Sequence, residues 1–118
     1  MFKFNSMNDI QEITQSLIKF RDERDWEQFH DSKNLATAIS IEAAELNELF
    51  LWKTIKESEE VDPDKIKDEL ADVLAFSLLL ANKHGFDVKQ IILDKIKKNG
   101  EKYPVEKSRS NAKKYNEL

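Results

Sequence analysis

The chain contains no cysteine. This absence excludes disulfide bonds, thiolate metal sites and a cysteine nucleophile, and it is compatible with a reducing compartment. Glycine and proline occur only twice each, where average usage would give about eight glycines and six prolines. Because an all-β fold needs many more turn residues, the scarcity of both favours helices joined by few loops.

Long apolar runs are also missing. The longest, residues 73–81, contains Ser77 and is far shorter than the roughly 20 residues of a bilayer span. Residues 1–5 carry no apolar stretch of the signal-peptide type, so a cytoplasmic location is expected. The net charge of −4 argues against non-specific binding of nucleic acid. We therefore expect neither a membrane nor a nucleic-acid polymer as a partner.

The sequence is rich in charged residues. Asp, Glu, Lys and Arg make up 36% of the 118 residues, against about 25% in an ordinary domain. The length is that of one domain. Apolar residues recur with the period of a helix in four segments, which predicts an all-α, four-helix bundle. The segments are residues 7–24, 33–52, 62–85 and 87–100.

Capping residues mark the predicted helix ends. Two glycines, Gly85 and Gly100, are expected to end the third and fourth helices. The expected starts, in chain order, are a capping box of Ser6 and Asp9, a cap at Asp31 or Ser32, Asp62 before Pro63, and Asp87 with Gln90.

Two stretches outside the predicted helices are polar. The connection 53–61 is expected to be mobile. Residues 1–104 are expected to form the helical domain, followed by a polar, basic C-terminal segment, 105–118. This segment is interpreted either as a flexible tail or as a flap that docks on an anion.

Carboxylates fall on faces of the predicted helices that should be apolar. Glu42 lies inside the apolar stripe of the second helix, and Glu45 lies beside it. On the third helix, Glu69 and Asp72 share the sector of Phe76. A buried charge is costly unless it is paired or binds a metal. One such glutamate alone is usually explained by contact with solvent or a lysine.

The acids form two pairs, each with a spacing of three residues, so the members of each pair share a helix face. If the two helices pack antiparallel, four carboxylates meet, and they cannot all stay ionised without cations. Sites built only of oxygen ligands suit hard ions, so Mg²⁺ is expected, with Mn²⁺ as a substitute. Because protein-bound Mg²⁺ commonly meets substrate phosphates, the pattern points to phosphate chemistry.

The two acidic pairs and their surroundings resemble the MazG-like, all-α nucleoside triphosphate pyrophosphohydrolases. The resemblance extends over nearly the whole chain, apart from residues 57–61, and is strongest to the dCTP pyrophosphatase branch. It rests on residues 23–30 (ERDWEQFH), 45–54 (ELNELFLWKT), 99–104 (NGEKYP) and 109–118 (RSNAKKYNEL).

The resemblance implies hydrolysis of a deoxynucleoside triphosphate, dCTP or a modified dCTP, between its α- and β-phosphates. The products would be a nucleoside monophosphate and pyrophosphate, and the role would be sanitation of the nucleotide pool. It also implies that Glu42, Glu45, Glu69 and Asp72 bind Mg²⁺, with Glu45 as the candidate that positions or deprotonates the attacking water.

The resemblance further implies substrate contacts for ten residues. Those expected to line the base pocket are Trp26, Glu27, Gln28, Phe29, His30, Trp52 and Phe76; those expected near the phosphates are Lys95, Asn99 and Lys102. Without the resemblance, ordinary packing would explain both tryptophans. Vertebrate dCTP-specific members carry His at the position of Leu17 and Tyr at that of Phe76. These departures remove two polar groups that could read a base, so the preferred base stays open.

The third predicted helix is apolar nearly all round beyond Asp72, which indicates burial from several sides. The resemblance implies dimers or dimers of dimers, and a homotetramer is expected. Two alternatives remain. One is an enzyme of the same fold that acts on dUTP or on several nucleoside triphosphates. The other is a helical adaptor without activity, whose acidic pairs form salt bridges.

Overall fold

The computed structural model describes residues 6–118, and within this range helices are the only regular secondary structure. The predicted all-α fold is confirmed. The long helices are α1 (Asp9–Asp22), α2 (Ser32–Glu48), α4 (Pro63–Lys83) and α5 (Val88–Lys102). The short elements are the helices α3 (Ile55–Ser58) and α6 (Val105–Ser108) and the 3₁₀ turns η1 (Glu27–Phe29) and η2 (Tyr115–Glu117).

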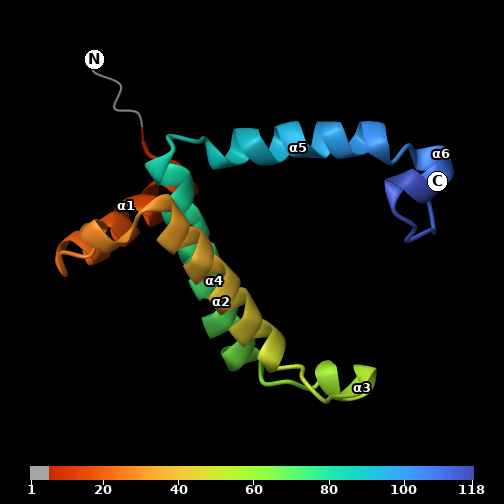
Figure 1. Ribbon diagram of the computed structural model, residues 1–118, viewed down its shortest axis with the longest axis horizontal. Helices are drawn as coiled ribbons and strands as arrows, with labels where there is room; N and C mark the ends of the chain where they lie inside the picture. Colours follow the sequence, from red (N-terminus) through yellow and green to blue (C-terminus); the bar gives the residue numbers. More distant parts are fainter. Residues whose placement is uncertain (1–5) are drawn as a thin grey trace. The chain divides into compact units, whose positions relative to one another are not determined.

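The chain divides into two compact units, one ending at Gly85 and the other spanning Phe86–Leu118. The first unit is built on the pairing of α2 with α4, which lie side by side in Figure 1, and α1 also packs against α4. Ser32 at the start of α2 shares a hydrogen bond of 2.9 Å with the Nε2 atom of His84, directly after α4. The two helices therefore run antiparallel.

The buried core of the first unit is small. Leu35 on α2 is 2% exposed, and it is joined by Leu79 and Ala81 near the end of α4. Thr14 is the one buried polar residue in the described part of the chain. Many large apolar side chains of α1, α2 and α4 stay exposed, so a single copy leaves much of its apolar surface in contact with water.

Three predicted helix starts are confirmed. Asp31 accepts a hydrogen bond from the Asn34 amide at the start of α2. Asp62 accepts one from Asp64 at the start of α4, where Pro63 is the first helical residue. At α5, Asp87 accepts from the Gln90 amide. Each side chain satisfies an amide that would otherwise lack a partner.

Other predicted boundaries were wrong. The capping box of α1 is formed by Asn8 and Gln11, whose side chains each accept the other's backbone amide, and not by Ser6 and Asp9. Helix α2 ends at Glu48, four residues before the predicted end at Trp52. Residues 49–52 form turns instead of continuing the helix. Gly100 does not end α5, which continues to Lys102.

The polar connection between α2 and α4 contains local structure of its own. Thr54 and Glu57 form a capping box that starts the one-turn helix α3. The Thr54 amide donates to the Glu57 carboxylate, and this hydrogen bond is the largest factor that lowers the pKa of Glu57. The connection is therefore held by hydrogen bonds that its sequence did not suggest.

In the second unit, the basic C-terminal segment turns back onto the end of α5. The Tyr115 ring meets the Tyr103 ring edge to face at 6.0 Å, and the Lys102 ammonium lies 4.9 Å from the centre of the Tyr115 ring. The segment is thus folded onto the helix that precedes it. The domain boundary expected at residue 104 stays a prediction. Among residues 6–118, no helix has the length and apolarity that a membrane crossing requires.

Candidate active site

The antiparallel pairing of α2 and α4 brings three of the four predicted metal ligands together. Ligand oxygens of Glu42, Glu69 and Asp72 all lie within 4.8 Å of one another. Glu42 comes from the middle of α2, and the other two come from α4, where a spacing of three residues places them on one face. We call these three residues the acidic cluster.

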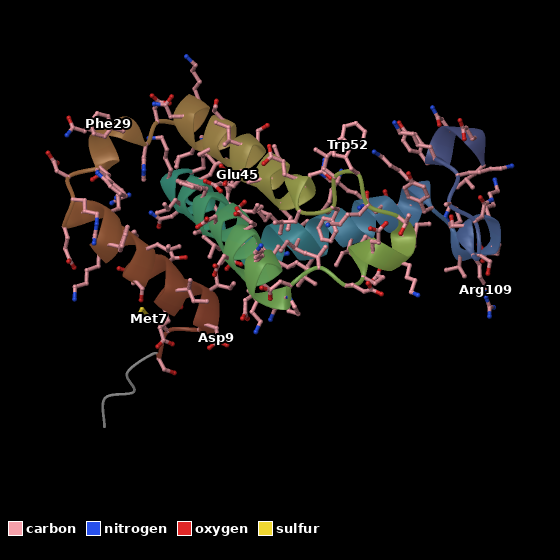
Figure 2. All side chains as sticks on the ribbon, turned by 90° about the horizontal axis from the view of Figure 1, so that it is seen from below. Met7, Asp9, Phe29, Glu45, Trp52 and Arg109 are labelled. Atoms are coloured by element: carbon pink, nitrogen blue, oxygen red, sulfur yellow. The ribbon has the colours of Figure 1, made fainter. Side chains whose placement is uncertain are left out.

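Glu45, labelled in Figure 2, follows Glu42 on α2 by three residues. It is exposed and does not belong to the group of three. Its carboxylate nevertheless interacts with both neighbours: it hydrogen-bonds Glu42 and raises the pKa of Glu69 through its charge. Glu45 can therefore reach the cluster while keeping contact with water.

The acids destabilise one another's charged forms. The hydrogen bond with Glu45, burial, and the charges of Glu45, Asp72 and Glu69 raise the pKa of Glu42 to about 7. Burial is the largest factor that raises the pKa of Glu69, followed by the charge of Glu45. One carboxylate oxygen of Glu42 and one of Glu69 are buried without a hydrogen-bond partner.

These features fit a divalent cation. A cation would offset the charges that the carboxylates exert on one another, and it would give the two buried oxygens a partner. The donor set consists only of carboxylate oxygens, which hard divalent ions prefer. The acidic cluster is thus a candidate site for such an ion.

An aromatic wall adjoins one end of the acidic cluster. Phe76 follows Asp72 by one turn of α4, and its ring meets the His30 ring edge to face, with the centres 6.3 Å apart. The Nδ1 atom of His30 is buried without a hydrogen-bond partner. Burial and then the charge of Arg21 lower the pKa of His30, which favours the neutral imidazole.

The rest of the predicted base pocket lies around the start of α2. Trp26 is 43% exposed and meets Phe20 edge to face at 5.9 Å. Phe29 is also exposed. Glu27 forms an ion pair with Arg21, and the Gln28 amide donates to Asp25. These local contacts position the segment, while the substrate contacts expected of it stay predictions.

Trp52 lies at the other end of α2. It is 92% exposed and has a φ of 61°, a left-handed backbone conformation that is uncommon for a bulky residue. Because α2 has 17 residues, about 25 Å of helix separates Trp52 from the segment of Trp26. One copy of the chain therefore does not bring the two tryptophans together.

The three residues predicted near the phosphates lie on α5 in the second unit. Lys95 is exposed, and Asn99 accepts the Tyr103 amide through its backbone oxygen. The Lys102 ammonium is engaged with the Tyr115 ring. Their roles in phosphate binding stay predictions.

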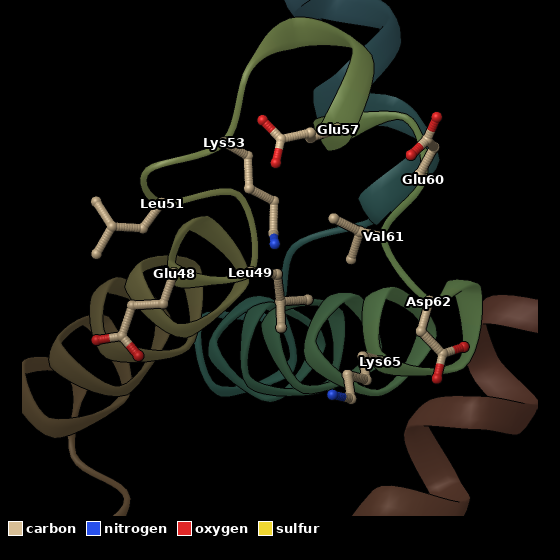
Figure 3. Close-up of a pocket in the computed structure, with 9 residues that line it drawn as sticks. All are labelled: Glu48, Leu49, Leu51, Lys53, Glu57, Glu60, Val61, Asp62 and Lys65. Atoms are coloured by element: carbon tan, nitrogen blue, oxygen red, sulfur yellow. The ribbon is translucent and has the colours of Figure 1, made fainter.

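A hollow of about 490 Å³ lies beyond the other end of the acidic cluster (Figure 3). Its walls come from the end of α2, the connection through α3 and the start of α4. The lining residues are Glu48, Leu49, Leu51, Lys53, Glu57, Glu60, Val61, Asp62 and Lys65. The sequence reasoning passed over Lys65, although its spacing of four residues from Glu69 places both on one face of α4.

Comparisons with known proteins agree with this architecture. The MazG-like family matches residues 37–118. dCTP pyrophosphatase 1 of Mus musculus is 38% identical over 99% of this chain and 72% of its own length, and that of Homo sapiens is 36% identical over the same shares. The crystal structure of a pyrophosphatase from Archaeoglobus fulgidus is similar with a TM-score of 0.80 and 36% identity, covering 87% of this chain and 99% of that one.

Proposed function

Because the chain belongs to the MazG-like family, we propose that it hydrolyses a deoxynucleoside triphosphate to the monophosphate and pyrophosphate, with dCTP or a modified dCTP as substrate. The observation that carries the proposal is the acidic cluster, whose three ligand oxygens converge within 4.8 Å between α2 and α4. The relatives named dCTP pyrophosphatase 1 support the substrate. The role would be sanitation of the nucleotide pool in the cytoplasm.

Glu42, Glu69 and Asp72 would hold Mg²⁺, with Mn²⁺ as a substitute. When bound, the ion supplies positive charge that offsets the charge of the triphosphate and of the transition state. The protein's own contribution is to keep the carboxylates converged on one point, because they project from two paired helices and not from loops.

We assign the role of general base to Glu45. It is exposed to water and contacts the cluster, so a water molecule can lie between its carboxylate and an α-phosphate held there. As this water forms its bond to the α-phosphorus, Glu45 accepts the proton. The bond between the α-phosphorus and the bridging oxygen breaks, and pyrophosphate leaves with the electron pair.

The aromatic wall formed by His30 and Phe76, one helical turn from Asp72, would hold the base. Aromatic rings bind bases by stacking, at about 1–3 kcal/mol per base. Phe76 and Leu17 offer no hydrogen bond to a base edge, which favours weak discrimination between bases. This feature supports the second candidate, an enzyme of the same fold that accepts dUTP or several nucleoside triphosphates.

The functional form would be a homotetramer, as a dimer of dimers. The exposed large apolar side chains include Ile41, Leu70 and Leu74 of the α2–α4 pair. Such a surface is unusual for a monomer and typical of subunit interfaces. Assembly would also let Trp52 of one copy approach the base segment of another.

Pyrophosphate release from dCTP, dUTP, dTTP and dATP, with Mg²⁺ and with EDTA, tests the activity. We expect metal-dependent release, reduced at least about 100-fold by Glu69→Gln because the variant loses a charged ligand. Glu12→Gln, at an exposed position in the first turn of α1, is the control and should keep activity. The ranking of the four nucleotides by rate of pyrophosphate release identifies the preferred base.

Absence of release from every substrate would contradict the proposal. Together with an unfolding temperature that Mg²⁺ does not change, it would favour the non-enzymatic adaptor, in which the acidic pairs are structural.

A further inference from the structure

The segment that carries His30 turns sharply out of α1. Asp25 has a left-handed backbone with a φ of 55°. The Trp26 amide donates to the Arg21 backbone oxygen at 3.1 Å, and the amide of Asp25 donates to the backbone oxygen of residue 22, also at 3.1 Å. These are the two hydrogen bonds of a Schellman motif, which ends a helix at a left-handed residue. The backbone therefore fixes the start of the turn.

Arg21 is the one charged residue of α1 whose side chain is mostly shielded from water. Its side chain is 14% exposed, whereas the other charged residues of α1 are exposed. A shielded guanidinium is costly unless its N–H groups meet acceptors. The Nε atom lies 2.9 Å from the Asp22 carboxylate, and the Nη2 atom lies 3.5 Å from the Glu27 carboxylate. Because Glu27 is the first residue of η1, the guanidinium links the end of α1 to the turn that follows.

The link continues through η1 to His30. The His30 amide donates to the Glu27 backbone oxygen at 3.0 Å. From the other side, the Asn34 side chain of α2 donates to the Phe29 backbone oxygen at 3.0 Å. The segment between α1 and α2 is thus held from both helices, in the position that brings the His30 ring against Phe76.

The charge of Arg21 also acts on His30. After burial, it is the second factor that lowers the pKa of His30, because a nearby cation disfavours the imidazolium. A neutral imidazole has one donor and one acceptor nitrogen, so it can form either kind of hydrogen bond with a base.

We propose that Arg21 is a positioning residue for the base of the nucleotide. Its guanidinium, through Glu27, fixes the segment that presents His30 to the aromatic wall. This role rests on the proposed function, because it requires the base to lie at that wall. Arg21 lies outside residues 23–30, on which the family resemblance rests, and it acts on the base through the turn and not by touching it.

The test compares ligands with and without a base. Calorimetry in Mg²⁺ would measure the binding of dCMP, dUMP and inorganic triphosphate to the wild type and to Arg21→Met. The variant should bind the preferred monophosphate about fivefold more weakly, which is the upper end of what one partly exposed ion pair contributes. The KM for the matching triphosphate should rise by a similar factor. Binding of inorganic triphosphate and kcat should stay unchanged, because the acidic cluster is not altered.

Three variants show which contact of Arg21 matters. Lys19→Met removes a cation from an exposed position of the same helix and should change no affinity. Asp22→Asn should also leave the monophosphate affinity unchanged, since the link to the turn runs through Glu27. Arg21→Met combined with Glu27→Gln should weaken binding no further than Glu27→Gln does, because the two residues act through one contact.

His30 supplies a second measurement. The chain has two histidines, and His30→Gln identifies the signal of His30 in proton NMR spectra. Arg21→Met should raise the pKa of His30, and Lys19→Met should leave it as it is. Arg21→Lys keeps a cation at this position, so it should bind the monophosphate more tightly than Arg21→Met does. Circular dichroism establishes that each variant folds.

Two results would overturn the positioning role. One is an unchanged monophosphate affinity in Arg21→Met. The other is an equal weakening of monophosphate and inorganic triphosphate, which would indicate a general loss of structure.

Failure of the proposed function gives a different pattern. In that case the wild type releases no pyrophosphate from any nucleotide, while calorimetry with the monophosphates still tests Arg21, and a wild type that binds neither monophosphate would contradict its role as well. If the wild type hydrolyses nucleotides and Arg21→Met binds the monophosphate as tightly as the wild type does, the function stands and the positioning role is wrong.

Discussion

At the scale of single residues, the acidic cluster makes stability depend on pH. The pKa of Glu42 is raised to about 7, above the ordinary value of 4.5. The folded chain therefore binds a proton more tightly than the unfolded chain, and stability falls as pH rises between about 4.5 and 7. In EDTA, we expect the unfolding temperature of the wild type relative to that of Glu42→Gln to be lower at pH 7.5 than at pH 5, measured by circular dichroism. The comparison cancels the opposite contribution of His30, whose pKa is lowered.

A neutral side chain and a divalent ion should both reduce this dependence. Glu42→Gln removes the titrating group, so its unfolding temperature should change less between the two pH values. Mg²⁺ should raise the wild-type unfolding temperature at pH 7.5 in particular, because it binds the ionised carboxylates of the folded state. An identical pH dependence of Glu42→Gln and wild type would contradict this account.

Phe76 is the residue at which base selection should be adjustable. Its ring faces His30, whose buried Nδ1 atom has no hydrogen-bond partner. Phe76→Tyr adds a hydroxyl to an apolar wall, and sites that form hydrogen bonds with a substrate discriminate more sharply. We expect the ratio of kcat/KM between the best and the second-best substrate to rise by about tenfold or more.

Phe76→Leu is the control for this change, since it alters the ring without adding a polar group. It should lower kcat/KM for all substrates and leave their ranking as it is. A ranking that shifts equally in both variants would show that ring shape, and not hydrogen bonding, sets the preference.

At the scale of helices, the side chains that cap a first turn were predictable. An Asp directly before a segment with helical apolar periodicity is a preferred N-cap, because its carboxylate accepts a backbone amide of the first turn. Asp31, Asp62 and Asp87 are examples. Helix ends were less predictable. Gly100 was expected to stop α5, but nothing in its surroundings requires a left-handed backbone there, and the helix continues for two more residues.

The two glycines should therefore respond oppositely to alanine. Gly100→Ala should raise the free energy of unfolding by about 0.5–1 kcal/mol, because the added Cβ meets no atom within 4 Å and alanine favours helix. Gly85→Ala should lower it by about 1 kcal/mol or more, since Gly85 has a φ of 68°. Urea denaturation measures both, and equal signs for the two variants would contradict the backbone argument.

The acidic pairs could be identified from their spacing alone, because carboxylates on the apolar face of a helix are costly to bury unless they are paired or bind a metal. The residues that surround the cluster could not be predicted in this way. The meeting of His30 and Phe76 depends on how the segment before α2 crosses α4, and the hollow depends on the turn after Glu48. Neither follows from periodicity within one helix.

At the scale of the whole molecule, the small core implies assembly. Leu74 is 54% exposed in the middle of α4, the helix that carries two of the three residues of the acidic cluster. We expect light scattering to give a mass several times the 13.8 kDa of one chain. Leu74→Glu should shift the population toward smaller species, because a charge buried at an interface is costly.

Asn82→Glu, which adds a charge at an exposed polar position near the end of the same helix, is the matched control and should leave the mass unchanged. A wild type that stays monomeric at all concentrations would contradict the proposed tetramer.

The exposed Trp52 also gives the chain an optical signal. An indole that is 92% exposed should fluoresce like tryptophan in water, whereas Trp26 is partly shielded by Phe20 and Arg24. In Trp26→Phe, emission then comes from Trp52 alone, and it should move to shorter wavelength when a second copy covers the ring and lose intensity when a nucleobase stacks on it. Dilution would reveal the first event and titration with nucleotide the second, without any added dye.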